Sequence, residues 1–195
     1  MPSYGEVITN PLGVYLAPLN TDDTFGTPQL VDYVQSVNLS FETDDDKIKA
    51  YGMNLEAGSW LIGAEVELEE AALSMPAKLI ATGYTENVTG TTPNQVARSK
   101  GVAGGEGKPY IGIVVVFAAT GGSAAVLGYP KSMLKEDPEW EAEQNQFRTG
   151  EMSFDTVVPH QTKRELYVLE RYESASDLPD FSLAASFGAL MGDMF

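Results

Sequence analysis

With 195 residues, 43% of them hydrophobic, the chain is long enough to bury a core, and its composition excludes wholesale disorder. Its formal net charge of −16 excludes nucleic-acid binding by phosphate neutralisation, which requires clustered lysine and arginine. The absence of cysteine excludes disulfides, thiolate metal sites and cysteine nucleophiles.

Alternation of apolar and polar side chains predicts β-strands in the first part of the chain. Residues 14–17 form a short apolar strand, and residues 31–42 form a long strand with one polar face. Residues 47–51 are expected to pair with that strand across an acidic turn at 44–46. These last segments belong to a predicted long loop, 43–58, and long loops often contact other chains.

Residues 59–70, SWLIGAEVELEE, form the most strongly two-faced segment of the sequence. Apolar side chains occupy the even positions from 60 to 68, and the glutamates Glu65, Glu67 and Glu69 stand at odd positions. Because side chains alternate faces along a strand, one face is apolar and the other carries three carboxylates. Like charges on one face repel, so this row is either a solvated surface or a surface with a function.

One short helix is expected next, capped by Ser74, with Pro76 in its first turn and Gly83 at its end. The glycine-rich and weakly apolar run that follows, 89–109, predicts a second long loop.

The strands predicted in the second half are more buried. Residues 110–119, YIGIVVVFAA, are apolar on both faces, as in the interior of a sandwich. Residues 123–127 and 131–134 continue the β pattern on either side of Pro130, which suits an edge or a bulge. The last two predicted strands are residues 151–156 and 165–172. The sequence therefore predicts a mainly β domain over 1–172, a β-sandwich or split barrel with one short helix.

Residues 173–195 are expected to form a separate tail. Its apolar side chains recur at helical spacing, and it has no basic residue, which argues against binding to a membrane surface. So apolar a segment docks either on its own domain or on a neighbouring subunit, and both alternatives stay open. The candidates for docking on a neighbouring subunit are Phe181, Phe187, Met191 and Phe195.

No motif of enzyme chemistry is found. The single histidine, His160, has no recognisable catalytic partner, and the chain contains no Gly-X-Ser-X-Gly, His-Glu-X-X-His or P-loop sequence. The glutamates of 59–70 have a spacing compatible with glycoside hydrolysis, but any acidic strand offers it. We expect no enzymatic activity, no catalytic residues, no cofactor and no metal. With no leader-like segment and no membrane-length apolar run, a soluble protein folded in the cytosol is expected.

Several short segments occur in an order that is familiar from one protein family. They are GVYLAP at 13–18, FGTP at 25–28, the alternating strand 33–42 with its acidic turn and KIKAYG at 47–52, GAEVEL at 63–68, LIATG at 79–83 and PYIGI at 109–113. In this order the chain, over about residues 12–172, resembles the major tail (tail tube) proteins of long-tailed, non-contractile bacteriophages.

The resemblance implies a structural virion protein, synthesised in the host cytoplasm and located in the phage tail. Subunits would form hexameric rings, each subunit lending strands to a continuous inner β-barrel, and the rings would stack into a tube that conducts DNA to the host. The implied partners are further copies of the chain and the tape measure, tail terminator and distal tail proteins. DNA would pass through without specific binding, and no membrane would be bound.

Set in such a ring, two groups of residues acquire roles. The lumen-facing candidates are Asn38, Ser40, Glu42, Glu65, Glu67 and Glu69. The ring-stacking loop candidates are Asp44, Asp45, Asp46, Met53 and Leu55. For the three strand glutamates an outward-facing, solvated strand remains the alternative. The alternative function is a soluble acidic β-sandwich binding module, of a virion-surface or carbohydrate-binding type.

Overall fold

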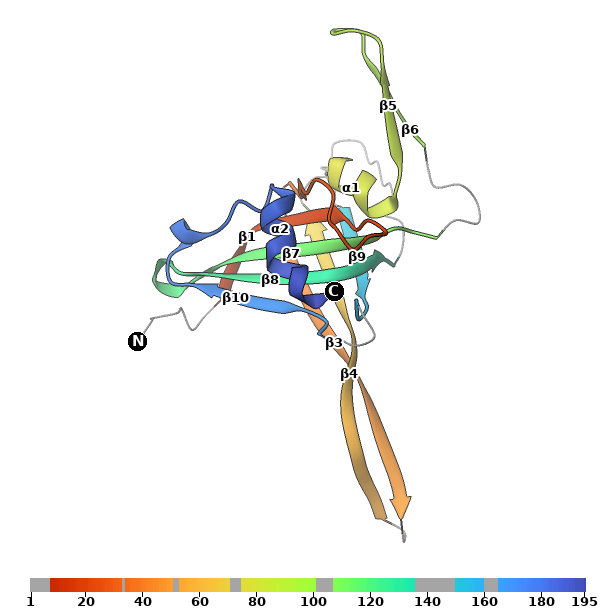
Figure 1. Ribbon diagram of the computed structural model, residues 1–195, viewed down its shortest axis with the longest axis vertical. Coiled ribbons are helices and arrows are strands. Elements are labelled where there is room, and N and C mark those ends of the chain that lie inside the picture. The colour runs from red at the N-terminus through yellow and green to blue at the C-terminus, as the bar shows by residue number, and fades with distance from the viewer. Residues whose placement is uncertain are drawn as a thin grey trace, which may run out of the picture.

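A computed structural model describes residues 8–32, 34–50, 53–70, 75–100, 107–135, 150–159 and 165–195 (Figure 1). Its strands are β1 (Ile8–Pro18), β2 (Gln29–Leu30), β3 (Val34–Ala50), β4 (Met53–Glu70), β5 (Thr85–Thr89), β6 (Val96–Lys100), β7 (Tyr110–Ala119), β8 (Ala124–Leu134), β9 (Gly150–Thr156) and β10 (Val168–Tyr172). Its helices are α1 (Met75–Thr82) and α2 (Ala184–Met191), with short 3-10 turns at Thr120–Gly122, Ala175–Asp177 and Gly192–Met194.

Eight strands form one antiparallel sheet in the order β2-β1-β7-β8-β9-β4-β3, with β10 also paired to β8. The remaining two strands, β5 and β6, form a small sheet of their own. This architecture confirms the predicted mainly β fold. The helix expected near residue 80 is also confirmed as α1, and it ends at Gly83, which has a positive φ of 70°. Ser74, its expected cap, lies outside the described residues.

The large sheet changes direction within β8. The pairing of β7 with β8 shifts between Ile111–Ser132 and Ile113–Tyr129, so that Pro130 lies at an irregularity of the ladder. The two segments predicted around Pro130 are thus one strand with a bulge. Residues 124–128 pair with β10, and residues 132–134 pair with β9. The bend turns β9, β4 and β3 across the sheet of β1 and β7.

The first hydrophobic core lies between these two layers. The strand expected to be buried on both faces, β7, contributes Ile111, Ile113 and Val115 to it. The other layer contributes the apolar face of β4 and β9, and α1 adds two alanines. The core residues of β4, β9 and α1 are Ala64, Val66, Leu68, Met152, Phe154, Ala77 and Ala81. The even positions of β4 that are described are therefore buried, as the alternation predicts.

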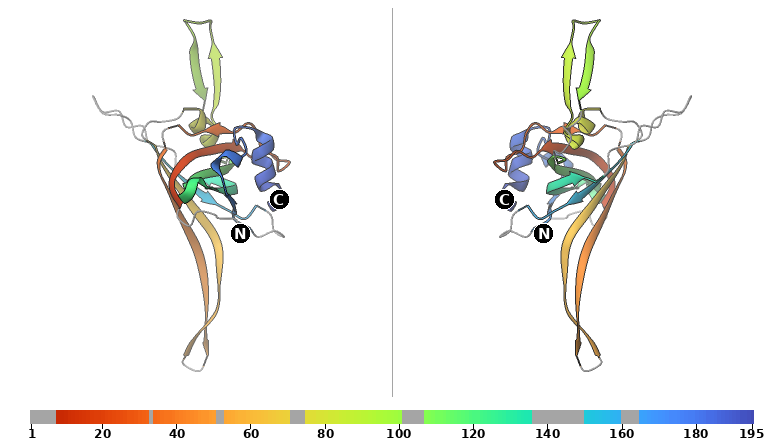
Figure 2. Two further views of the ribbon diagram at one scale, coloured as in Figure 1. Left: turned by 90° about the vertical axis from the view of Figure 1, so that its left-hand side faces the viewer. Right: turned by 90° about the vertical axis from the view of Figure 1, so that its right-hand side faces the viewer.

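A second core covers the opposite face of β7 and β8, and α2 supplies its outer layer (Figure 2). Phe187 is fully buried and packs edge-on against Phe25, with ring centroids 5.0 Å apart. Gly112 leaves room for both rings, since a Cβ there would lie 2.5 Å from Phe25 Cε1 and 2.7 Å from Phe187 Cε1. Because two apolar faces of β7 need covering, the C-terminal segment completes the domain.

This packing decides between the two docking alternatives for the tail. Phe181, Phe187 and Met191 are buried in the second core, and Phe195 packs against it with its ring 5.7 Å from that of Phe25. The assignment of these four residues to a neighbouring subunit is therefore wrong. Their side chains are covered by their own sheet, where the missing Cβ of Gly112 makes space for them.

The predicted loop at 43–58 is also wrong, because β3 and β4 form one long hairpin. Their pairing continues from Val34–Glu70 to Ala50–Met53, far beyond the body of the domain (Figure 1). Asp44, Asp45 and Asp46 do not form a turn but pair with residues 60, 59 and 58 of β4. Residues 47–50 belong to the same strand as 34–42 and so do not pair with it. The charged residues and glycines of this segment predicted a loop. Backbone pairing in a hairpin does not require a buried face, so such residues are compatible with a strand.

The second predicted loop, 89–109, is replaced over its first part by the β5–β6 hairpin, whose register runs from Thr85–Lys100 to Thr89–Val96. Gly90, with φ of 94°, begins the connection between the two strands. This hairpin and the β3–β4 hairpin extend in opposite directions along the long axis of the molecule (Figures 1 and 2). Within the described part of the chain, no helix is long and apolar enough to cross a membrane.

Candidate functional site

The polar positions of β3, β4 and β9 come together on one face of the sheet. Directly opposite residues of antiparallel strands share a face, and the register places three such rows side by side. The opposite face of the same strands is the first core. The rows are Ser36–Glu69–Glu151, Asn38–Glu67–Ser153 and Ser40–Glu65–Asp155, and we call these nine residues the acidic face.

Five of the six lumen-facing candidates belong to this acidic face. Asn38, Ser40, Glu65, Glu67 and Glu69 are brought together as the alternation of β3 and β4 predicts. The sixth, Glu42, pairs with Gly63 farther along the hairpin, and its side chain lies outside the described residues.

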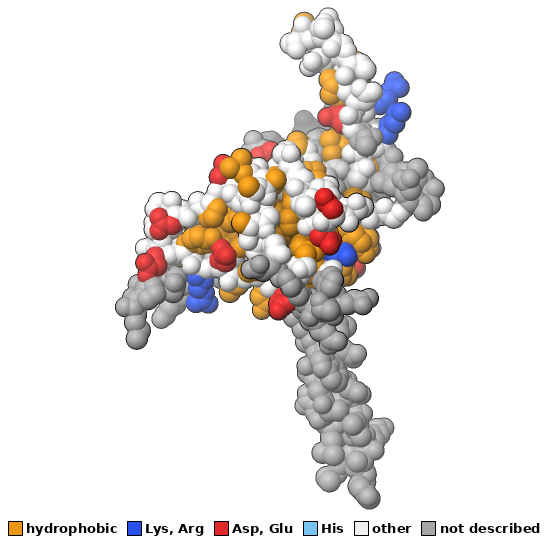
Figure 3. Space-filling view, in the orientation of Figure 1, with side chains coloured by type: hydrophobic (Ala, Val, Ile, Leu, Met, Phe, Trp, Pro, Cys, Tyr) orange, Lys and Arg blue, Asp and Glu red, His pale blue; other side chains and the backbone are white. Residues whose placement is uncertain are grey.

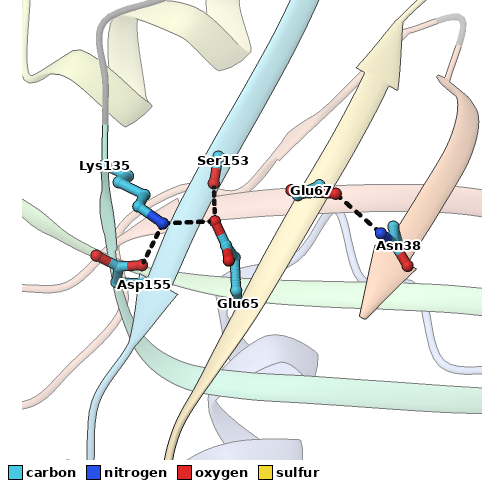
Figure 4. Close-up of polar contacts among 6 residues, drawn as sticks. All are labelled: Asn38, Glu65, Glu67, Lys135, Ser153 and Asp155. Atoms are coloured by element: carbon cyan, nitrogen blue, oxygen red, sulfur yellow. Dashed lines mark hydrogen bonds and ion pairs between the residues drawn. The ribbon is translucent and has the colours of Figure 1, made fainter. Parts of the chain in front are cut away.

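Two of the glutamates accept hydrogen bonds from neutral groups across the strand pair. Asn38 Nδ2 donates to Glu67 Oε2 over 2.9 Å (Figure 4), and Ser36 Oγ donates to Glu69 Oε2 over 3.0 Å. These bonds orient the carboxylates without neutralising them. The negative charge of both side chains is therefore presented to solvent.

Glu65 differs because a cation reaches it. Lys135 Nζ donates to Glu65 Oε1 over 2.9 Å, and Ser153 Oγ donates to the same oxygen over 2.7 Å (Figure 4). The Lys135 ammonium also lies 3.9 Å from Asp155 Oδ1. The hydrogen bond from Lys135, followed by that from Ser153, holds the pKa of Glu65 below its usual value. Glu65 is thus a paired carboxylate at the border of the acidic face.

Four residues around these glutamates were missed in the sequence. Glu151, Ser153 and Asp155 are the polar positions of the predicted strand 151–156, so their alternation was visible, but nothing local indicated that β9 pairs with β4. Lys135 follows the end of β8, and its backbone N–H bonds the carbonyl of Ser153, which holds it beside Glu65. Only the tertiary pairing brings these residues to one surface.

The acidic face is a broad surface of carboxylates, hydroxyls and one amide. A shallow hollow of about 360 Å³ lies over it, lined by Ser36, Asn38, Glu67, Leu68, Glu69 and Glu151. Across the described residues, no group of three or more His, Asp or Glu side chains is arranged to hold a metal ion. The arrangement can repel anions close to its surface and offers them hardly any counter-charge. His160 lies outside the described residues.

The ring-stacking loop candidates lie on the part of the β3–β4 hairpin that projects from the domain. Met53 pairs with Ala50, and Leu55 pairs with Ile48, near the end of the hairpin. The three aspartates, 44–46, lie between this end and the acidic face. The side chains of these five candidates lie outside the described residues.

The ion pair of Glu65 predicts a pH-dependent contribution to stability. The pKa of Glu65 is lowered by folding, so its stabilising effect is complete above the ordinary value of about 4.3 and is lost as the pH falls through the lowered value. Since the side chain of Lys135 is 45% exposed, solvent screens the pair, and Glu65→Gln should cost less than about 1 kcal/mol at pH 7.

Urea denaturation of the wild type and Glu65→Gln at pH 7 and near pH 4 measures this effect. The difference between the two proteins should shrink at the lower pH. The exposed Glu173 serves as a control, because Glu173→Gln should change stability little at either pH. A difference for Glu65→Gln that is equally large at both values would contradict the assigned ion pair.

Comparison with known proteins adds no relative from which a role could be transferred. Neither a scan against protein-family models nor a search of curated proteins finds a match to this chain.

Proposed function

We propose that this chain is a tail tube protein of a long-tailed, non-contractile bacteriophage. Its subunits form hexameric rings that stack into a tube, and the tube conducts DNA from the virion to the host. The proposal rests on the resemblance described above and on one structural observation: the acidic face covers a sheet whose other face is core and whose last strand, β3, is an edge.

The edge position of β3 supports assembly into a ring. β3 has 17 residues and pairs with β4 on one side, at the end of the order of described strands. A long edge strand presents unpaired N–H and C=O groups and is a template for pairing with another chain. In the ring, the sheet of one subunit continues into that of the next.

The dimensions of such a ring suit duplex DNA. If each of six subunits contributes four strands, about 24 strands at about 4.8 Å spacing and about 40° tilt give a circumference near 150 Å. After side chains of about 5 Å on each wall, a lumen of roughly 38 Å remains, which holds a duplex and a layer of water.

The charge of the acidic face then has a function. Its five carboxylates and the neighbouring Lys135 amount to about −4 per subunit and about −24 per ring of six. At physiological salt the Debye length is about 8 Å, so DNA at the axis experiences a weak field and DNA near the wall is repelled. Such a wall avoids binding phosphates and lets DNA slide.

Negative-stain electron microscopy of the purified full chain at high concentration tests the proposal. Stacked rings or tubes with a central channel are the expected result. A protein that remains monomeric at every concentration in sedimentation velocity would contradict it and would favour a soluble β-sandwich binding module instead.

A further inference from the structure

The β5–β6 hairpin projects from the domain, and no other helix or strand of the described residues covers it (Figure 1). It forms a two-stranded sheet of its own, and the described side chains from Glu86 to Arg98 are all exposed. Val88 and Val96 are 51% and 59% exposed. A two-stranded hairpin is marginally stable alone in water, so this one offers a surface that a partner would stabilise.

The two faces of this hairpin differ in charge. Asn87 pairs with Arg98 and Thr89 with Val96, and Lys100 follows Arg98 by two positions, so these residues share one face. All five, Asn87, Thr89, Val96, Arg98 and Lys100, line a shallow hollow of about 210 Å³. We call these five residues the basic face. Glu86 lies on the other face, and Figure 3 shows the basic groups along one side of the hairpin.

The basic face has no acidic residue, and among the described residues neither Arg98 nor Lys100 has an ion-pair partner. This is unusual in a chain with 28 acidic and 12 basic residues. Lys135, a basic residue on the body of the domain, is bound to Glu65, whereas Arg98 and Lys100 together present two positive charges on one face of the hairpin. A partner with complementary charge would present a carboxylate-rich surface of similar length to the basic face.

We propose that the basic face of β5–β6 binds the acidic β3–β4 hairpin of a second copy of this chain. Asp44, Asp45 and Asp46 occupy consecutive positions of β3 in its projecting part. With Glu56, they outnumber the two lysines of this part, Lys47 and Lys49, and Glu56 lies opposite Lys47. The proposal rests on the proposed tube and names the surface that receives the stacking hairpin.

The positions of the two hairpins make this contact head-to-tail. They lie at opposite ends of the long axis, so the upper hairpin of one copy meets the lower hairpin of the next (Figure 1). A contact between two different surfaces leaves a free hairpin at each end of the pair, and it therefore repeats along a stack. Because the charges are exposed, the contact weakens as the Debye length falls from about 8 Å at 0.15 M salt to about 3 Å at 1 M.

Charge reversal at one exposed arginine tests the contact against a matched control. Arg98 on β6 and Arg171 on β10 are both exposed strand residues, so Arg98→Glu and Arg171→Glu change the net charge equally. Stacking is measured by sedimentation velocity and negative-stain microscopy, with circular dichroism to verify the fold. Arg98→Glu should raise the concentration needed for stacking at least tenfold, and Arg171→Glu should behave as the wild type.

Reciprocal exchange provides a second, independent readout. Combining Arg98→Glu and Lys100→Glu should abolish stacking, and adding Asp44→Lys and Asp46→Lys, two positions on one face of β3, in the same chain should restore it. Arg98→Gln, which only removes the charge, should give an intermediate loss.

The outcomes separate this inference from the proposed function. Stacking of Arg98→Glu at the same concentration as Arg171→Glu would overturn the hairpin contact and leave the tube standing. Equal loss in both variants would also overturn it, because net charge alone would then control assembly. A wild type that never stacks would overturn both proposals. If Arg98→Glu instead lost binding to a short DNA duplex with stacking unchanged, the basic face would serve another partner and the inference would fall.

Discussion

Replacing Phe187 by alanine is expected to lower the free energy of unfolding of the isolated subunit by about 3–5 kcal/mol. The Phe187 side chain is fully buried, packs edge-on against Phe25 and fills the space that Gly112 leaves above β7. Its removal exposes or empties the centre of the second core, which joins α2 to the sheet. The loss therefore arises within one chain and does not depend on assembly.

Urea denaturation at a concentration where the protein is monomeric measures this loss. Leu183, directly before α2, is 54% exposed and provides the control, because Leu183→Ala should change the free energy of unfolding by no more than about 0.5 kcal/mol. If Phe187→Ala cost as little as the control in the monomer, the tail would not be held by its own sheet. Docking of the tail on a neighbouring subunit would then return as the better explanation.

The strands with a strong local pattern could be predicted from the sequence. β7 reads as apolar on both faces, and the structure indeed buries Val114 and Val116 in one core and Ile113 and Val115 in the other. The alternation of β4 likewise predicts which of its faces is core. In both strands the pattern of side chains alone predicts which faces are buried, because each face of a strand meets a single environment.

The partners of these strands could not be predicted. Glu67 pairs with Ser153 across 86 positions of sequence, and no local signal specifies that pairing or its register. The docking site of the tail could not be predicted for the same reason. Gly112 becomes a packing site for Phe187 only once β7 and the C-terminal segment lie together. The sequence therefore predicts only part of the acidic face. It predicts the residues of β3 and β4, but not those of β9 or the neighbouring Lys135.

The two hairpins were missed for a different reason. Charged and glycine-rich segments usually mark turns, but a hairpin satisfies its backbone groups by pairing, whether or not either face is buried. The consecutive aspartates at 44–46 therefore extend a strand. The two segments predicted to be loops are thus paired hairpins, which project at opposite ends of the molecule.

If the proposed function is correct, reversing charge on the acidic face is expected to convert a tube wall that repels DNA into one that retains it. Glu67 and Glu69 are the suitable pair, since their partners are the neutral Asn38 and Ser36 and their replacement leaves no buried charge behind. Glu65 is unsuitable, because a lysine there would face Lys135, the present donor to its carboxylate. Glu67→Lys with Glu69→Lys should leave the fold and the assembly of tubes intact and should slow DNA ejection at least tenfold at low salt.

The control for this prediction carries the same change in net charge at another place. Glu165 and Glu173 are exposed glutamates that flank β10 and do not belong to the acidic face, and their double replacement by lysine should leave ejection unchanged. Ejection is measured from phage that carry either pair of changes, over a range of salt concentrations. Because retention by lysines depends on released counterions, the delay for Glu67→Lys with Glu69→Lys should disappear as salt rises. Normal ejection by that variant at low salt would mean that the acidic face lies outside the tube, on a surface that DNA never approaches.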